Sequence, residues 1–344
     1  MMKKALNRSL GAARATKQDE FYTQLSDIEK ELKHYTTHFE DKVVLCNCDD
    51  PRVSQFFHYF SYNFERLKLK KLIATCYKNQ DTDLFSTHKA EKGVCLEYNG
   101  NKNHTRVPDP AEIGVHKFNG DGDFRSEECI ALLKQADIVV TNPPFSLFRE
   151  YVQQLIDYDK KFLIIGNHNA ITYKEIFGLI RGNKVWLGYS NPVNFIVPDH
   201  YEQRAVRSWR DENGTNWRSL GNACWFTNLD IAKRHEELIL YRSYDPEQYP
   251  SYNNYEAIEV AKCADIPADY EDPMGVPVTF LDKHNPEQFE ILGITDRGNE
   301  WGLKIREYTR EDVSNPGDLN RRAAIKTGNT YKATYARLLI KRRR

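Results

Sequence analysis

Between residues 43 and 187, short apolar runs alternate with stretches whose apolar residues recur at helical spacing, and this rhythm constrains the fold more than any other feature. We expect strands at 43–46, 72–76, 115–118, 137–141, 162–165 and 185–187, and helices at 26–39, 54–67, 127–134, 147–158 and 172–180. The alternation predicts an α/β fold with a mostly parallel sheet and helices on both faces. Ligands bind such sheets at the carboxyl ends of the strands, so the residues just after each strand are candidates for a site.

The segments outside this rhythm suggest how the rest of the chain is organised. Residues 1–17 are basic and poor in apolar side chains, which is typical of a disordered arm. Residues 78–114 are polar and are interpreted as an insertion, whereas 223–227 reads as one more strand of the core sheet. Beyond Asp230 the alternation stops, and the chain becomes rich in Tyr, Pro and Asn.

Composition excludes several classes of protein. The 344 residues include 49 basic and 49 acidic side chains, so any nucleic-acid contact must come from local positive patches. Mean hydropathy is −0.69, and no apolar run is long enough for a membrane span. The N-terminus lacks the apolar core of a secretory signal. Seven scattered cysteines favour a reduced, cytoplasmic protein without a disulfide framework.

The sharpest chemical signal is Asn142-Pro143-Pro144-Phe145, directly after the expected strand 137–141. The amine of a ring such as adenine is a poor nucleophile because its lone pair is delocalised. The side-chain oxygen of Asn142 and the carbonyl of Pro143 could accept its two N–H bonds, while the prolines stiffen the loop and Phe145 stacks on the ring. A rigid turn at a strand end is the alternative reading. A base from a duplex reaches such a pocket only when it is flipped out.

Asn-Pro-Pro-Phe after a hydrophobic strand resembles the catalytic motif of amino-group DNA methyltransferases, and the wider chain resembles the EcoRI-type adenine-specific DNA methyltransferase family. The strings that carry this resemblance are DEFYTQLSDIEKEL, CNCDDPRVSQFF, NGDGDFRS, DIVVTNPPFSLFREY, NACWFTNLD and MGVPVTFLDKHNPEQFEILG. The resemblance implies a Rossmann-like class I methyltransferase sheet, S-adenosylmethionine as methyl donor, adenine N6 as acceptor and no metal. It implies in-line displacement, in which positioning supplies most of the rate.

The resemblance also implies which residues line the cofactor. These are Phe21, Tyr22, Thr23, Asp49, Asp50, Asp121, Asp123 and Phe124. Each of the three groups also has a purely structural interpretation. Phe21 and Tyr22 could simply pack as two aromatic rings, and Asp49 or Asp50 could be the N-cap of the next helix, with Pro51 in its first turn. The segment 120–124 could be an ordinary Asp-Gly turn. The acid that usually holds the cofactor ribose is replaced by Cys76-Tyr77-Lys78, and the usual glycines after the first strand are missing.

The order of motifs, with the cofactor motifs first and a basic region last, resembles the gamma group of these enzymes. It implies a catalytic domain at 18–230 and a target-recognition region at 231–344. It also implies double-stranded DNA as the partner, and a monomer would suffice for one methyl transfer. The expected DNA contacts are Arg207 and Arg210, beside a hairpin turn at 211–214, and Arg321, Arg322, Lys326 and Arg337 near the C-terminus.

Two other functions remain open from the residues alone. Asn-Pro-Pro-Phe fits methylation of other planar amines, namely RNA adenine, cytosine N4 or a glutamine side chain. The missing glycines and ribose acid also fit a DNA-binding relative without catalysis. Cys46-x-Cys48 has no second pair at metal-site spacing, so we expect no metal there.

Overall fold

The computed structural model describes residues 21–48, 50–77, 92–100, 110–197, 207–296, 301–312, 322–328 and 330–343. The chain folds into two compact units. The first comprises residues 1–168 and 187–229, and the second comprises 169–186 and 230–344.

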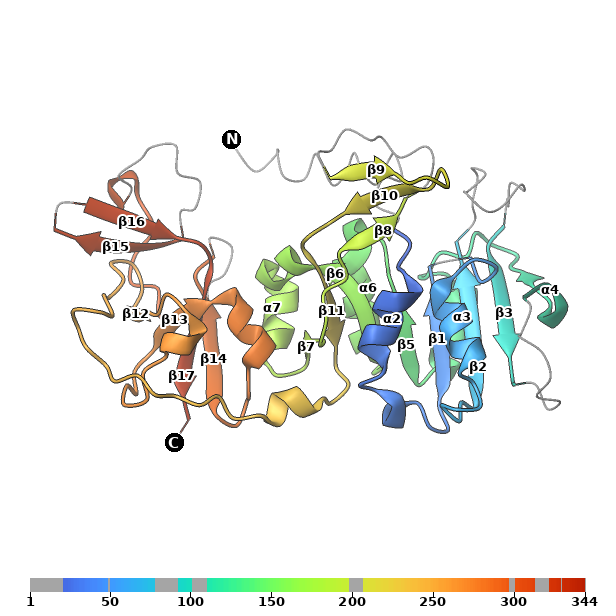
Figure 1. Ribbon diagram of the computed structural model, residues 1–344, viewed down its shortest axis with the longest axis horizontal. Helices are drawn as coiled ribbons and strands as arrows, with labels where there is room; N and C mark the ends of the chain where they lie inside the picture. Colours follow the sequence, from blue (N-terminus) through green and yellow to red (C-terminus); the bar gives the residue numbers. More distant parts are fainter. Residues whose placement is uncertain are drawn as a thin grey trace. The chain divides into compact units, whose positions relative to one another are not determined.

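An eight-stranded mixed sheet forms the centre of the first unit, and its strand order is β4-β3-β2-β1-β5-β6-β11-β7 (Figure 1). The strands are β1 (Val43–Asn47), β2 (Lys71–Cys76), β3 (Val94–Tyr98), β4 (His116–Lys117), β5 (Ile138–Thr141), β6 (Lys161–Asn167), β7 (Trp186–Leu187) and β11 (Ala223–Thr227). Strands β2, β1, β5 and β6 are parallel, as their apolar sequences predict. The carboxyl ends of these four strands therefore share one edge of the sheet.

The expectation of a mostly parallel sheet is wrong at the flanks. Strand β11 pairs antiparallel with β6, and β3 pairs antiparallel with both β2 and β4. Strand β3 lies within 78–114, which the sequence analysis took for an insertion. Its burial alternates between buried and half-buried residues, so it has the pattern of a strand with one partly solvated face rather than a continuous apolar run.

Helices cover both faces of this sheet. The helices of the first unit are α2 (Leu25–Leu32), α3 (Gln55–Tyr62), α4 (Pro110–Ile113), α5 (Glu127–Gln135) and α6 (Phe148–Asp157). Trp225 and Phe226 are consecutive in β11, so their side chains point to opposite faces. Phe56 of α3 packs against Trp225 with ring centroids 6.1 Å apart, and Phe148 of α6 packs against Phe226 at 5.0 Å.

Several helices are shorter than their apolar spacing predicts. Helix α3 ends at Tyr62 rather than near residue 67, because the chain continues as turns to residue 68. The expected helix 26–39 divides into α2 and a short 3₁₀ turn at Thr36–His38. The other 3₁₀ turns are Phe145–Leu147, His168–Thr172, Ala232–His235, Cys263–Asp265, Val278–Lys283 and Arg310–Asp312.

A second, three-stranded antiparallel sheet belongs to the first unit. Its order is β8-β10-β9, with β8 at Asn194–Ile196, β9 at Ser208–Arg210 and β10 at Asn216–Ser219. Figure 1 shows it on the side of the large sheet where the carboxyl ends of the parallel strands lie. The expected turn at 211–214 joins β9 to β10, and Gly214 adopts the positive φ of 81° that this turn requires.

The second unit contains one α-helix, α7 (Lys174–Arg181), within its described residues. A four-stranded sheet has the order β12-β13-β17-β14, and β15 and β16 form a separate hairpin. Their bounds are β12 (Ile258–Glu259), β13 (Met274–Pro277), β14 (Phe289–Ile294), β15 (Ala323–Thr327), β16 (Thr330–Thr334) and β17 (Arg337–Arg342). Ala323 and Ile325 of the hairpin pack with Tyr252, Tyr255 and Leu339 in one buried cluster.

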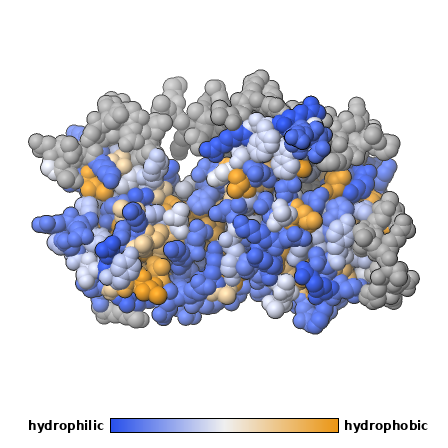
Figure 2. Space-filling view, in the orientation of Figure 1, coloured by the Kyte–Doolittle hydropathy of each residue, from blue (hydrophilic) through white to orange (hydrophobic). Residues whose placement is uncertain are grey.

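The face drawn in Figure 2 is mainly hydrophilic, and its hydrophobic residues lie in limited patches. Across the described part of the chain, no helix has the length and apolar character that a membrane span requires.

Candidate functional site

The Asn142–Phe145 loop lies at the carboxyl end of β5, where the sequence predicted it. Asn142 and Pro143 are buried, whereas Pro144 and Phe145 are half-buried. A 3₁₀ turn begins at Phe145 and runs directly into α6. The loop is therefore held between the central strand β5 and a long amphipathic helix, and Phe145 keeps part of its ring accessible.

The segment Phe21–Thr23 packs against this loop, so the structure brings together two groups of residues that the sequence singled out separately. The Asn142 side-chain nitrogen donates to the Phe21 carbonyl at 2.5 Å and to the Thr23 hydroxyl at 3.2 Å. The Phe21 and Phe145 rings lie 5.5 Å apart at a tilt of 45°. Tyr22 exchanges backbone hydrogen bonds with Ile196, which anchors the segment to β8.

These contacts fix which way the Asn142 amide faces. A backbone carbonyl can only accept hydrogen bonds, so the NH₂ group must face Phe21 and the side-chain oxygen must face away. That oxygen is buried and has no hydrogen-bond partner within the described residues. An unpaired buried acceptor costs free energy, on the order of 1–3 kcal/mol. Asn142 thus holds a buried oxygen ready to accept a hydrogen bond from a ligand N–H group.

The carboxyl ends of β1 and β5 are tied together beside this loop. The Thr141 hydroxyl donates to the Asn47 carbonyl, and the Tyr151 hydroxyl of α6 donates to the Asn47 side-chain oxygen. Burial raises the pKa of Tyr151, so its hydroxyl stays protonated and keeps donating. The next residue, Cys48, has a φ of 85°, a left-handed conformation that favours glycine. Cys48 therefore adopts a glycine-like conformation directly after β1, in the loop where the resemblance implies glycines that the sequence lacks.

Asp50 lies after β1 but does not cap the next helix. Its carboxylate accepts from the Arg52 backbone N–H at 2.9 Å and from the Arg52 Nε at 2.8 Å. Ser54 caps α3 instead, by accepting from the Phe57 N–H at 3.3 Å. Pro51 lies in the turn before the helix, so its placement in the first helical turn is wrong. The other candidate acid, Asp49, falls outside the described residues.

The Asp121–Phe124 loop lies next to the end of β2. Gly122 has a φ of 76°, and a side chain at this position would come within 2.5 Å of the Cys76 carbonyl. Asp121 accepts from the Asp123 N–H at 3.1 Å and hydrogen-bonds Tyr77; burial and the Asp121 charge raise the pKa of Tyr77. The expected Asp-Gly turn is thus packed against the end of β2, at Cys76 and Tyr77.

Asp123 and Phe124 face α6. Arg125 donates to Asp123 from Nε at 2.8 Å and to Glu150 of α6 at 2.8 Å. The Phe124 ring contacts Tyr151 edge-on, with centroids 5.1 Å apart. A cavity of about 10 Å³ lies beneath Phe124, between the sheet and α5 and α6, which is roughly the space of one water. The loop therefore presents an acid and a half-buried aromatic ring at the same sheet edge as Asn142.

Glu31 is a residue of this region that sequence reasoning missed. Its fully buried carboxylate accepts from the Tyr35 hydroxyl at 2.8 Å and from the N–H groups of Tyr189 and Ser190 at 2.7 Å each. It joins α2, which follows Phe21–Thr23, to the loop that leads into β8. The sequence does carry a signal for the burial of Glu31. The residue lies three positions after Ile28 and directly before Leu32, which places it on the apolar face of the helix.

The six basic residues expected to contact DNA have different surroundings. Arg207 and Arg210 are exposed at the β9–β10 hairpin of the first unit, and Lys326 is exposed on β15 of the second. Arg322 pairs with Asp296, and burial lowers the pKa of Arg322. Arg337 forms a bidentate ion pair with the buried Glu259, with its NH2 at 2.7 Å from Oε1. Arg321 lies outside the described residues.

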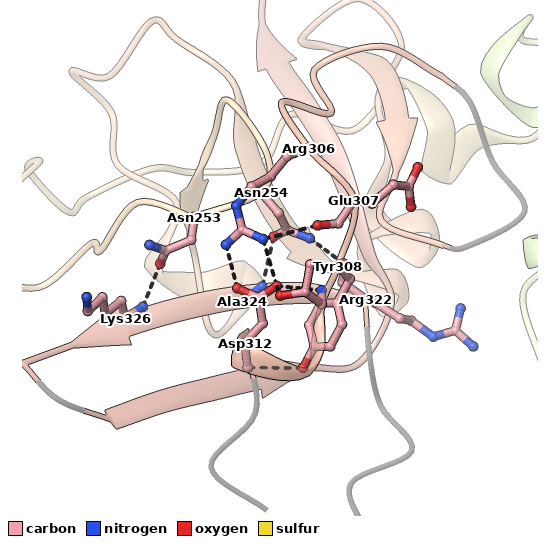
Figure 3. Close-up of polar contacts among 10 residues, drawn as sticks. Asn253, Asn254, Arg306, Glu307, Tyr308, Asp312, Arg322, Ala324 and Lys326 are labelled. Atoms are coloured by element: carbon pink, nitrogen blue, oxygen red, sulfur yellow. Dashed lines mark hydrogen bonds and ion pairs between the residues drawn. The ribbon is translucent and has the colours of Figure 1, made fainter. Parts of the chain in front are cut away.

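Side chains of Asn253 and Asn254 hold the β15–β16 hairpin in place (Figure 3). The buried Asn254 donates to the Arg322 carbonyl at 3.0 Å and accepts from the Ala324 N–H at 2.9 Å. Asn253 accepts from the Lys326 N–H at 2.8 Å. The two amides thus make hydrogen bonds to backbone groups at the edge of β15, as a neighbouring strand would. They hold in place the strand that carries Lys326.

An ion pair between the exposed Arg306 and the buried Asp312 lies beside these amides (Figure 3). Arg306 donates to both oxygens of Asp312, at 2.8 and 2.5 Å, and the Tyr308 hydroxyl donates to the Asp312 carbonyl at 3.1 Å. The hydrogen bonds from Arg306 lower the pKa of Asp312. Among all the described residues, no group of three or more His, Cys, Asp or Glu side chains is arranged to hold a metal ion.

Comparison with known proteins identifies the class of enzyme to which this arrangement belongs. The family model described as adenine-specific methyltransferase EcoRI matches residues 9–343. The type II methyltransferase M.EcoRI of Escherichia coli is 53% identical over 310 residues, which cover 89% of this chain and 94% of the relative. M.MgeORF184P of Mycoplasma genitalium is 37% identical, covering 81% and 84%, and M.MpnI of Mycoplasma pneumoniae is 34% identical, covering 96% and 97%. No solved structure matches the chain.

The chain therefore belongs to the EcoRI family of adenine-specific methyltransferases, and it is an enzyme. The family resemblance seen in its sequence motifs is confirmed.

Proposed function

We propose that the protein transfers a methyl group from S-adenosylmethionine to the N6 amine of adenine in double-stranded DNA, as the modification enzyme of a restriction–modification system. The observation that carries this proposal is the buried, unpaired side-chain oxygen of Asn142 at the carboxyl end of β5. Membership in the adenine-specific family gives the acceptor base, and its type II relatives suggest the biological setting. We place this reaction in the cytoplasm, where a bacterium or its phage holds DNA.

In this proposal the protein acts by positioning the amine. The Asn142 side-chain oxygen and the Pro143 carbonyl accept the two N–H bonds, so the nitrogen lone pair points out of the ring plane. Phe145, whose ring is held by Phe21 but half-exposed, stacks on the flipped base. The rigid Pro143-Pro144 backbone keeps both acceptors in place before the base arrives. In-line displacement then needs neither a metal nor a covalent intermediate.

The cofactor would supply an activated methyl group on a sulfonium, and the residues at the sheet edge are compatible with it. We assign Phe21, Tyr22, Thr23, Asp50, Asp121, Asp123 and Phe124 to its binding, together with Asp49. Asp50 and Asp123 are paired with arginines, but a carboxylate has about four acceptor sites, so each can also accept from an ammonium or a hydroxyl. Phe124 provides a half-buried ring for the adenine of the cofactor.

The fold supports the same assignment at the level of strand order. A parallel β2-β1-β5-β6 core followed by an antiparallel strand accords with a Rossmann-like class I methyltransferase sheet. The antiparallel β3 departs from that pattern. We assign residues 18–230 to catalysis and 231–344 to target recognition, with double-stranded DNA bound by the enzyme as a monomer.

Among the basic residues, the exposed Arg207, Arg210 and Lys326 are the best candidates for phosphate contacts. Arg321 and Arg322 directly precede β15 in the sequence and are also proposed to contact phosphates. For Arg322 this requires that a phosphate replace Asp296 as its partner. We leave Arg337 out, because removing it from Glu259 to reach DNA would leave a buried carboxylate unpaired.

The first test is methyl transfer from labelled S-adenosylmethionine to unmethylated genomic DNA, followed by nucleoside analysis. Labelled N6-methyladenine is expected, and Asn142→Ala should abolish it while cofactor binding stays within about twofold of wild type. The label in N4-methylcytosine, in RNA or in protein glutamine would replace the acceptor in this proposal. Absence of cofactor binding would instead support a DNA-binding relative without catalysis.

A further inference from the structure

The β8-β10-β9 sheet carries a row of apolar side chains on one face. Cross-strand pairing places Ile196 opposite Trp217 and Trp217 opposite Trp209, so the three side chains share a face. The next row, Phe195, Arg218 and Ser208, points to the other face. Phe195 is fully buried, which identifies its face as the inner one. The tryptophan row therefore lies on the outer face.

This sheet is joined directly to the proposed base pocket. The Tyr22 N–H donates to the Ile196 carbonyl at 2.9 Å, and the Ile196 N–H donates back at 3.2 Å. Phe195 contacts Phe21 with ring centroids 5.9 Å apart, and Phe21 in turn contacts Phe145. Trp209 lies three strand spacings from Tyr22, or about 14 Å. That distance is comparable to the width of a DNA major groove, roughly 12 Å, so this row is within reach of a duplex that delivers its adenine to Asn142.

The two tryptophan rings are prearranged and partly solvent-exposed. They are parallel to within 5°, with centroids 6.1 Å apart. The Trp217 indole N–H donates to Asp211 at 2.8 Å, which fixes that ring, while Trp209 is 40% exposed. A large aromatic side chain left in water forgoes burial energy that folding normally gains. Two parallel rings that present an open face are what a stacking ligand requires.

The charges around the row favour a nucleic acid as that ligand. Arg207 is exposed two residues before Trp209, and the Ser219 N–H donates to its carbonyl at 2.9 Å, so strand alternation places the Arg207 side chain on the tryptophan face. Arg210 pairs with Asn216, the neighbour of Trp217, and therefore points to the other face. The turn carries two acids, Asp211 and the exposed Glu212. Asp211 is already engaged by the Trp217 indole and by the Asn213 and Thr215 N–H groups, and these bonds lower its pKa. The tryptophan face thus presents one cation, Arg207, beside the aromatic rings, while the Asp211 carboxylate is occupied by hydrogen bonds within the turn.

We propose that Trp209, supported by Trp217, stacks on a DNA base next to the extruded adenine, with Arg207 on a flanking phosphate. The inference rests on the proposed function, because it requires a duplex at the Asn142 pocket. Flipping an adenine leaves its neighbours unstacked, and an indole at the surface replaces part of the lost stacking. Trp209 thereby favours the extruded state as well as DNA binding.

The test measures the affinity of the full-length protein for a short unmethylated duplex that the wild type binds, over a range of salt concentrations. Trp209→Ala is expected to weaken binding by about 5- to 150-fold, which is the loss of one base–aromatic stack. Its salt slope should match wild type, since an indole displaces no counterion. Arg207→Ala should instead reduce the slope by about 0.9, as expected for one lost phosphate contact.

Tyr62→Ala is the matched control. Tyr62 is 51% exposed in the same unit but lies at the end of α3, which runs back from the carboxyl edge of the sheet. This variant should bind DNA as wild type does. Trp209→Phe should recover most of the affinity and Trp209→Gln should not, so this pair decides the question if the alanine variant folds poorly.

Wild-type affinity in Trp209→Ala, or equal losses in the Phe and Gln variants, would overturn the stacking role. If these results are obtained while the wild type methylates adenine in DNA, the stacking role is wrong and the proposed function stands. If the wild type transfers no methyl group to DNA, the proposed function itself is wrong.

Discussion

The Asn142 side-chain nitrogen donates a hydrogen bond of 3.2 Å to the hydroxyl of Thr23, a residue 119 positions earlier in the chain. Together with the Phe21 carbonyl, this contact holds the NH₂ group of the amide and leaves its oxygen for a ligand. The N-terminal segment therefore selects which of the two amide atoms faces the proposed amine site.

Thr23→Val removes one of the two acceptors that hold the amide and keeps the size of the side chain. We expect the rate of methyl transfer in a single turnover to fall about tenfold, which corresponds to roughly 1.4 kcal/mol. The KM for DNA should change little, because the duplex itself is bound elsewhere. Thr23→Ser keeps the hydroxyl and should retain most of the rate. Equal losses in the two variants would assign Thr23 a packing role instead.

Glu31→Gln tests the buried carboxylate that joins α2 to the loop before β8. All of its observed partners donate, including the Ser190 hydroxyl at 2.6 Å, so a glutamine NH₂ group would face donors. We expect the free energy of unfolding of the first unit to drop by about 2–4 kcal/mol in urea denaturation. Glu29→Gln, on the exposed face of the same helix, should stay within about 0.5 kcal/mol of wild type. If Glu31→Gln unfolded at the same urea concentration as wild type, the carboxylate would not have this stabilising role.

Lys326 and Arg337 form a second matched pair, because both are basic residues near the C-terminus with opposite surroundings. Lys326→Ala should leave the melting temperature unchanged and reduce the salt slope of DNA binding by about 0.9. Arg337→Ala should destabilise the second unit by about 3–5 kcal/mol, because it leaves Glu259 buried without its partner. Thermal melting and DNA titration of both variants check this. If Arg337→Ala were as stable as wild type and reduced the salt slope of DNA binding, Arg337 would be a DNA contact and not a structural residue.

The central strands of the large sheet could be predicted from sequence because they are buried on both faces and read as continuous apolar runs. Strand β3 could not, since its alternating pattern is weak and polar segments surround it. The Asn142–Phe145 loop was correctly predicted at a strand end. Its contact with Thr23 depends on how the chain returns after 119 residues, which no local pattern encodes.

Basic residues near the C-terminus show the same limit. Arg337 was expected to contact DNA because of its charge, yet the run from Arg337 to Arg342 forms β17, an inner strand between β13 and β14. The apolar residues Leu338, Leu339 and Ile340 within it are buried and account for this placement. Charge alone does not separate Arg337, which pairs with Glu259, from Lys326, which is exposed.

A last prediction concerns His284, a largely buried side chain of the second unit. Burial, with smaller contributions from the charges of Arg234 and Arg343, lowers the pKa of His284 from 6.5 to about 4. Its ring nitrogen Nε2 lies 3.0 Å from the Phe289 carbonyl, so the neutral ring donates there. The folded protein therefore keeps His284 neutral at pH values where the unfolded chain is already protonated.

Between about pH 6.5 and pH 4 the unfolded state binds more protons than the folded state, so the free energy of unfolding falls as the pH is lowered through this window. The full effect of this one group is about 3 kcal/mol, reached near the lower limit. His284→Gln keeps a donor for the Phe289 carbonyl but cannot be protonated, so its stability should depend less on pH. Urea denaturation of both proteins at pH 7.5 and pH 5 measures the difference. If the variant loses as much stability as wild type between these values, the pH dependence arises from other groups.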